Sequence, residues 1–239
     1  MKKITFYPSS QDVVNLVPPP KPAKAYVPEW YKKIKPVDKS NPKFKKDGTQ
    51  LNVNLKQCMP FLDTLTSGYI QETWSDIFIS VDQDSEGNYV VDIGYPMGPE
   101  QVNYRFAPTM LDVTSEYFPI EFVWIEPWVP KTPNGYSTIL TQPFNRTDLP
   151  FYSLTGIIDS DKFYHEIHGA YPFFLKKEFN KTIIPAGTPM YQMIPLKRDS
   201  WEMGLENFNE KEMLSRKSSV RKYIYDGYRN YFWQKKDYK

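Results

Sequence analysis

Proline outnumbers glycine in this chain, with 22 residues against 11. Proline fixes φ and lacks a backbone N–H, so it breaks helices and is excluded from the interior of central strands. This balance disfavours a helical bundle and favours short strands that are joined by proline-containing turns. Aromatic residues, at 16 % of the chain, can fill the core of such a fold.

The prolines are densest in residues 18–42, where lysines lie between them. This composition favours extended polyproline geometry over a regular sheet. The same region also contains apolar residues that a free linker would lack, namely Tyr26, Val27, Trp30, Tyr31 and Ile34. We therefore expect residues 1–48 to form an extended, basic, proline-rich arm that is ordered against the body or a neighbour. One helical turn is expected at 29–35, after Pro28.

A β-rich body is expected over residues 49–208. Alternating apolar and polar residues, bounded by turn residues, predict strands at 77–81, 89–93, 102–106, 121–125, 136–140, 151–158, 171–175 and 190–194. A short helix is expected at 58–70, with Pro60 in its first turn. The predicted fold is mainly β, with a β-clip, barrel-like or sandwich-like core. The strand at 187–194 is expected at its centre, because it is apolar on both faces.

The pattern changes to a helical period after residue 208. Asn209 and Glu212 have the spacing of a capping box, which is typical of a helix start. We expect a C-terminal helix at 210–233, within the segment 209–239. Its buried face would consist of apolar residues at helical spacing, including Val220, Ile224, Tyr228 and Tyr231. The chain is thus expected to be a single domain with an appendage at each end.

The net charge of +2 conceals an uneven distribution. Residues 1–48 carry +7 and residues 209–239 carry +5, so residues 49–208 carry −10. Basic ends and an acidic body favour contact with the body of the same or another copy. Nucleic acid is a less favoured partner, because the acidic body would repel phosphate. The sequence has no run of 18 apolar residues, so we expect no membrane contact, and its one cysteine, Cys58, fits a reducing compartment.

The two histidines of the chain, His165 and His168, flank Glu166. Two imidazoles and a carboxylate are metal ligands, so this stretch is a candidate metal site. Histidines three residues apart share a face of a helix, but the local pattern indicates a strand or loop, where they point to opposite faces. We therefore predict no cofactor. A divalent metal at His165 and His168 is the alternative, and it would make the protein a cupin-like oxygenase.

Two segments resemble motifs of the dUTPases and dCTP deaminases, enzymes with a β-clip fold. They are Gly-Ile-Ile-Asp at 156–159 and Ile-Pro-Ala-Gly-Thr-Pro-Met-Tyr-Gln-Met-Ile at 184–194. The resemblance implies that Asp159 acts as the general base that activates water, and that Gln192 and Gly187 bind the substrate on its phosphate side. The serine-containing phosphate-binding segment and the glycine-rich C-terminal arm of those enzymes have no counterpart in this sequence.

Four further stretches, spread over nearly the whole chain, resemble an uncharacterised protein family of tailed marine phages. They are Val-Pro-Glu-Trp-Tyr-Lys-Lys at 27–33, Cys-Met-Pro-Phe-Leu-Asp-Thr at 58–64, Lys-Thr-Pro-x-Gly-Tyr-Ser at 131–137 and Ile-Pro-Leu-Lys-Arg-Asp-Ser-Trp at 194–201. This resemblance implies a phage origin and a location in the host cytoplasm or the virion. The leading hypothesis is a non-enzymatic structural or interaction protein that self-associates or binds a virion or host protein. The alternative is a dUTPase-like nucleotide hydrolase that uses Asp159.

Overall fold

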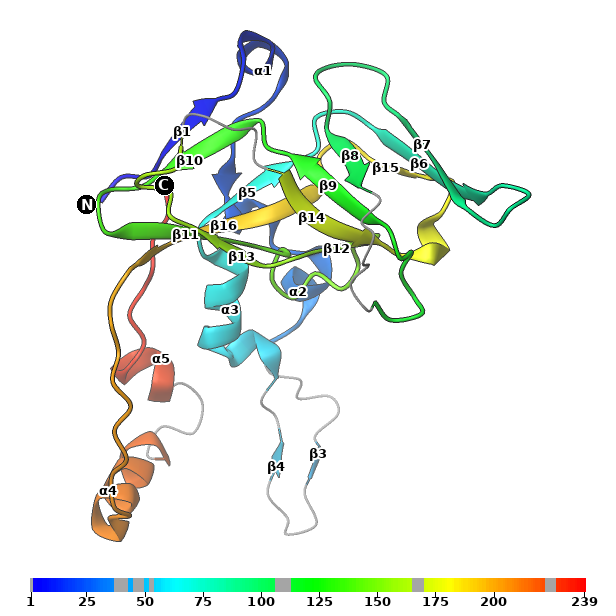
Figure 1. Ribbon diagram of the computed structural model, residues 1–239. Helices are drawn as coiled ribbons and strands as arrows, with labels where there is room; N and C mark the ends of the chain where they lie inside the picture. The colour runs from blue at the N-terminus through cyan, green and yellow to red at the C-terminus, as the bar shows by residue number, and fades with distance from the viewer. Residues whose placement is uncertain are drawn as a thin grey trace. The chain divides into compact units, whose positions relative to one another are not determined.

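The computed structural model describes residues 2–36, 43–44, 50–51, 54–105, 113–164, 170–221 and 227–239. The chain divides into two compact units. Unit 1 comprises Met1–Tyr26 and Gly68–Arg198, and unit 2 comprises Val27–Ser67 and Asp199–Lys239. Antiparallel strands dominate the described residues (Figure 1), so the prediction of a mainly β fold is confirmed.

Unit 1 contains nearly all of the strands. Its elements are β1 (Thr5–Pro8), α1 (Gln11–Leu16), β2 (Lys21–Pro22), η1 (Ala23–Tyr26), β5 (Tyr69–Glu72), β6 (Ile77–Gln83), β7 (Tyr89–Gly94), β8 (Val102–Arg105), β9 (Glu121–Ile125), β10 (Trp128–Lys131), β11 (Tyr136–Thr141), β12 (Phe151–Ser153), β13 (Gly156–Ile158), β14 (Ala170–Leu175), η3 (Lys177–Phe179), β15 (Thr182–Ile184) and β16 (Pro189–Lys197). The β6–β7 hairpin confirms the strands that were predicted at 77–81 and 89–93.

The strands of unit 1 form open sheets. The orders are β13-β11-β16-β5-β2, β12-β14-β9-β8, β15-β6-β7 and β1-β10. β16 pairs with β11 on one side and β5 on the other, and its first five residues are buried. A strand between two others in a covered sheet must be apolar on both faces, so the expected central position of this strand is confirmed.

The two larger sheets share one core. The ring of Tyr171 on β14 lies 4.8 Å from the ring of Tyr191 on β16, measured between centroids. Ser153 on β12 accepts a hydrogen bond from the Trp124 indole (3.0 Å) and donates one to the Met190 carbonyl on β16 (2.8 Å). Because side chains from both inner faces interdigitate in this way, the core is sandwich-like.

The run 151–158, predicted as one strand, forms two strands in different sheets. β12 pairs with β14, whereas β13 pairs with β11. Between them, Leu154 N donates to Pro172 O (2.8 Å), and the hydroxyls of Thr155 and Thr141 share a hydrogen bond (2.8 Å). These two bonds hold the linking residues to different sheets, so the chain crosses the sandwich where the pattern alone predicts a continuous strand.

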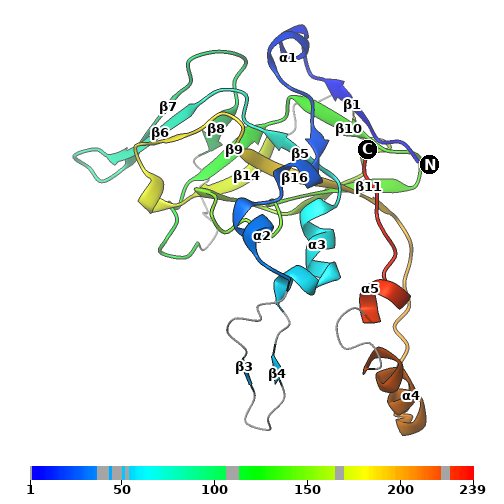
Figure 2. The same ribbon diagram turned by 180° about the vertical axis from the view of Figure 1, so that it is seen from behind.

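Residues 1–48 are divided between the two units. β1 pairs with β10, which Figure 2 shows from behind, and β2 pairs with β5 at the edge of the five-stranded sheet. The side chains of Val13, Val17 and Ala23 are buried. Residues 2–26 are therefore part of the β core, while the remainder of this proline-rich segment belongs to unit 2.

Most of the regular elements that the structure describes in unit 2 are helices. Its elements are α2 (Glu29–Lys33), β3 (Lys43–Phe44), β4 (Gln50–Leu51), η2 (Leu55–Gln57), α3 (Met59–Thr66), α4 (Glu210–Arg221) and α5 (Gly227–Tyr231). The helical turn predicted after Pro28 is α2, and Pro60 lies in the first turn of α3 as predicted. Of the helices that the structure describes, none has the length and apolar character needed to cross a bilayer.

The C-terminal helix is present as α4 and α5, and residues 222–226 between them lie outside the described residues. Asn209 caps α4 by accepting a hydrogen bond from Glu212 N (3.2 Å), as the capping-box spacing predicts. The expected burial of Tyr228 and Tyr231 is wrong, since both are about half exposed. Ile224 and the side chain of Val220, which were predicted on the same buried face, lie outside what the structure describes. α4 has few apolar residues, so it offers no continuous apolar face that could cover them.

Candidate functional site

The Asp159 side chain lies just after β13 and is held from two sides. Ser137 Oγ donates to its Oδ1 atom (2.7 Å), and Arg198 Nη1 donates to the same oxygen (3.1 Å). The side chain is 63 % exposed. A general base needs a carboxylate oxygen that is free to accept a proton from water. One oxygen of Asp159 is already paired with a guanidinium and a hydroxyl.

Arg198 makes its closest contacts with a second carboxylate, Asp161. Its Nη1 donates to Oδ1 (2.9 Å), its Nη2 donates to Oδ2, and Gly135 N also donates to Oδ2 (2.9 Å). The hydrogen bonds from Arg198 lower the pKa of the buried Asp161 carboxyl from 3.8 to about 2. Arg198 N donates to Gly135 O as well (2.9 Å). The cluster therefore fastens the end of β16, where the chain leaves unit 1.

Gln192 is part of the core of unit 1 and does not face solvent. Its side chain is 1 % exposed, and its Oε1 atom accepts a hydrogen bond from Phe144 N (2.9 Å). Gly187 lies in a turn with φ of +83°, a conformation that favours glycine. Its N–H donates to Thr73 O (2.8 Å). Both residues thus have clear structural roles.

The structure does not bring Asp159, Gln192 and Gly187 together. On β11, Ser137 contacts Asp159, whereas Thr141 is the register partner of Gln192. These two positions are four residues apart on the strand, a distance of about 13 Å. Gly187 lies beyond the opposite end of β16. Within one copy of the chain, the three residues that the resemblance implies therefore lie apart.

The predicted metal ligands His165 and His168 lie outside the described residues. Within the part of the chain that the structure describes, no group of three or more histidine, cysteine, aspartate or glutamate side chains could hold a metal ion. No protein-family model matches the chain, and no curated protein is similar enough to count as a relative. The resemblances to phage proteins and to dUTPases stay predictions.

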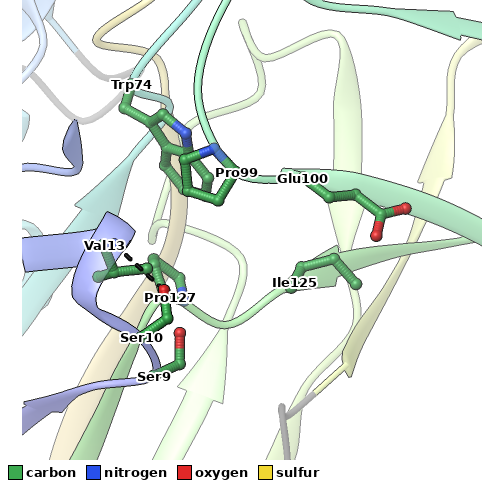
Figure 3. Close-up of a pocket in the computed structure, with 8 residues that line it drawn as sticks. All are labelled: Ser9, Ser10, Val13, Trp74, Pro99, Glu100, Ile125 and Pro127. Carbon is green, nitrogen blue, oxygen red and sulfur yellow. Dashed lines mark hydrogen bonds between the residues drawn. The ribbon is translucent and has the colours of Figure 1, made fainter.

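A pocket in unit 1 lies away from the Asp159 cluster. It has a volume of about 270 Å³ and is lined mostly by apolar atoms (Figure 3). The lining residues are Ser9, Ser10, Val13, Trp74, Pro99, Glu100, Ile125 and Pro127. Sequence reasoning missed this site. Its walls come from four segments that are far apart in the chain, and no spacing within one segment signals the pocket.

Glu126, a carboxylate, is buried between the two large sheets of unit 1. Tyr171 donates its hydroxyl hydrogen to Glu126 Oε1 (2.6 Å). Burial raises the pKa values of the Tyr171 and Tyr191 phenols well above the usual value for tyrosine. The Glu126 carboxylate raises both pKa values further. Both phenols therefore stay protonated at any physiological pH.

Residues 201–208 expose large apolar side chains in a segment without regular secondary structure. Trp201 is 91 % exposed, Met203 84 % and Leu205 89 %. They alternate with Glu202, Gly204 and Glu206 in the sequence, which is the pattern of a half-buried strand. Phe208 is exposed as well. This alternation is the signal that could have identified the segment, which was predicted to belong to the β body.

Proposed function

We propose that the protein is a non-enzymatic, self-associating β protein of phage origin, which works in the host cytoplasm or the virion. The observation that carries the proposal is the exposed apolar segment at 201–208. Scattered apolar residues on a surface are ordinary, but a contiguous group of large ones is typical of an interaction site. Trp201, Met203 and Leu205 follow one another at alternate positions and are nearly fully exposed.

A second copy of the chain is the partner that the segment fits best. The sheets of unit 1 are open, and strands such as β13 and β15 have one neighbouring strand among the described residues. Their outward residues Ile157 and Ile183 are more than half exposed. An alternating segment can add to such an edge by main-chain hydrogen bonds, with its apolar side chains covered by the neighbour. Burial of each of these apolar side chains would contribute about 2 kcal/mol to the free energy of association.

Light scattering after size-exclusion chromatography tests this proposal. The wild type is expected to form oligomers whose mass increases with protein concentration. Replacing Trp201, Met203 and Leu205 by serine should leave a monomer with an unchanged melting temperature. A matched control replaces by serine three exposed apolar residues of unit 1 that lie outside the strand edges, namely Val14, Leu16 and Met97. If only this control becomes monomeric, or if the wild type is monomeric throughout, the proposal is wrong.

The alternative function, nucleotide hydrolysis at Asp159, has its own test. We expect no release of pyrophosphate from dUTP or dCTP with Mg²⁺, because Gln192 is buried and Asp159 is already paired with Arg198. Release by the wild type that Asp159→Asn abolishes, without a change in melting temperature, would establish the alternative and overturn the non-enzymatic proposal.

A further inference from the structure

The pocket of unit 1 is held open by hydrogen bonds within its walls. Gln101, which is fully buried, accepts a hydrogen bond from Trp74 N at Oε1 (3.0 Å) and donates from Nε2 to Ser75 Oγ (2.6 Å). Its carbonyl accepts from Ile125 N (3.0 Å). One residue therefore ties the Trp74 wall to the Ile125 wall.

The position of the Trp74 ring is fixed by close packing. Gly98 has φ of +100°, and a Cβ atom there would lie 3.1 Å from Trp74 Nε1. The positive φ favours glycine, and any side chain at this position would have to displace the indole by a few tenths of an ångström. Pro99 follows directly and lines the pocket with Trp74 (Figure 3).

The N-terminal segment supplies the facing wall. Ser9 N donates to Pro127 O (2.9 Å), and Ser10 Oγ accepts from Val13 N (3.2 Å). The Val13 side chain is 2 % exposed. Each wall is thus fixed before any ligand arrives, so binding would cost little ordering of the protein.

Glu100 determines the charge of the pocket. It is the one ionisable residue among the described residues that line the space, and no described residue forms a hydrogen bond or ion pair with its carboxylate. Burial and the nearby Glu100 carboxylate raise the pKa of the Tyr95 phenol. An anionic ligand would therefore be repelled, whereas a cation would meet an unpaired carboxylate at the edge of an apolar space.

We infer that this pocket binds a small organic cation, an ammonium group on an apolar body. The apolar body would pack against Trp74, Pro99 and Pro127, and the ammonium group would pair with Glu100. The volume suits a compact ligand with a single ring or a short aliphatic chain. This site is independent of the proposed self-association, because none of its lining residues belongs to 201–208.

Isothermal titration calorimetry of the full chain with three ligands of one skeleton tests the inference. Benzylamine is a cation at pH 7, benzyl alcohol is neutral and benzoate is an anion. The wild type should bind benzylamine about fivefold more tightly than benzyl alcohol, as expected for one partly exposed ion pair, and benzoate most weakly. Equal affinity for all three ligands, or no heat with benzylamine, would overturn the inference.

Two variants locate the binding. Glu100→Gln should weaken benzylamine binding about fivefold and leave benzyl alcohol binding unchanged. The control Glu178→Gln removes another exposed carboxylate of unit 1, outside the lining, and should change neither affinity. Ser9→Phe should fill the space and abolish binding of all three ligands. If benzylamine binds Glu100→Gln and Ser9→Phe as tightly as the wild type, the cation is bound elsewhere and the inference is wrong.

Discussion

Tyr171 and Tyr191 lie side by side in the core with different hydrogen bonding. Tyr171 donates to Glu126, whereas the Tyr191 hydroxyl is buried and has no hydrogen-bond partner among the described residues. Burial of an unpaired hydroxyl costs free energy that a paired one recovers. The same chemical change at the two positions should therefore have different effects on stability.

We expect Tyr191→Phe to leave the free energy of unfolding unchanged or to raise it by up to ~1 kcal/mol, because it removes an unpaired polar group. Tyr171→Phe should lower the free energy of unfolding by about 2 kcal/mol, because it removes a hydrogen bond to a buried carboxylate. Urea denaturation followed by fluorescence measures both. Equal destabilisation by the two variants would show that the Tyr191 hydroxyl has a partner.

At the scale of single residues, the sequence pointed to Asp159 but not to Arg198, the residue that pairs with it. Asp159 and Asp161 belong to a recognisable motif, whereas Arg198 is some forty positions away and meets them only through the pairing of β11 with β13 and β16. Gln192 resembled a binding residue because its motif matched. Its burial depends on strands on both sides, which no local pattern reveals.

At the scale of elements, the turn at Gly68 joins α3 to β5 in a space that only glycine can occupy. Its φ is +70°, and a Cβ atom would lie 2.0 Å from Met193 O on the neighbouring strand β16. Its carbonyl accepts a hydrogen bond from Ala23 N (3.0 Å), which fastens η1 next to β2. The turn thus lies where β2, β5 and β16 of the five-stranded sheet meet.

Gly68→Ala should lower the free energy of unfolding by more than ~2 kcal/mol, since the left-handed backbone and the clash with Met193 O both oppose it. Gly135 is the matched control. Its φ is +80°, but a Cβ atom there would meet nothing within 4 Å. Gly135→Ala should cost only about 1 kcal/mol. Thermal melting of the two variants measures the difference, and equal losses would contradict the close contact at Gly68.

Alternation of apolar residues predicted most strands of unit 1, because their inner faces are buried and the pattern is therefore strong. The same rule was wrong at 151–158, where the chain crosses between sheets. No strand was predicted at 201–206, although apolar residues alternate there. Among the described residues, no strand pairs with this segment. Periodicity indicates which face of a segment is to be buried, but it does not identify the element that covers that face.

At the scale of the whole molecule, the two ends of the chain differ in how they are held. Residues 2–26 pair with β10 and β5, and Tyr26 donates its hydroxyl hydrogen to Glu72 (2.6 Å). The segment 199–239 belongs to unit 2, where the Trp233 indole donates to Asp63 (3.0 Å). Arg198 completes unit 1 immediately before this segment begins. Composition shows that both ends are basic, but not which of them belongs to the β core.

Truncation at each end distinguishes these roles. Deleting residues 1–26 removes strands from two sheets together with the burial of Val13 and Val17, so the melting temperature of the β core should fall sharply. Deleting residues 199–239 retains β16 and Arg198. The melting transition of the β core should therefore remain. In limited proteolysis of the full chain, trypsin should cut at Lys211 and Arg216 on exposed α4 before it cuts within residues 2–26. Rapid cleavage within residues 2–26, or an unchanged transition after their removal, would contradict their place in the core.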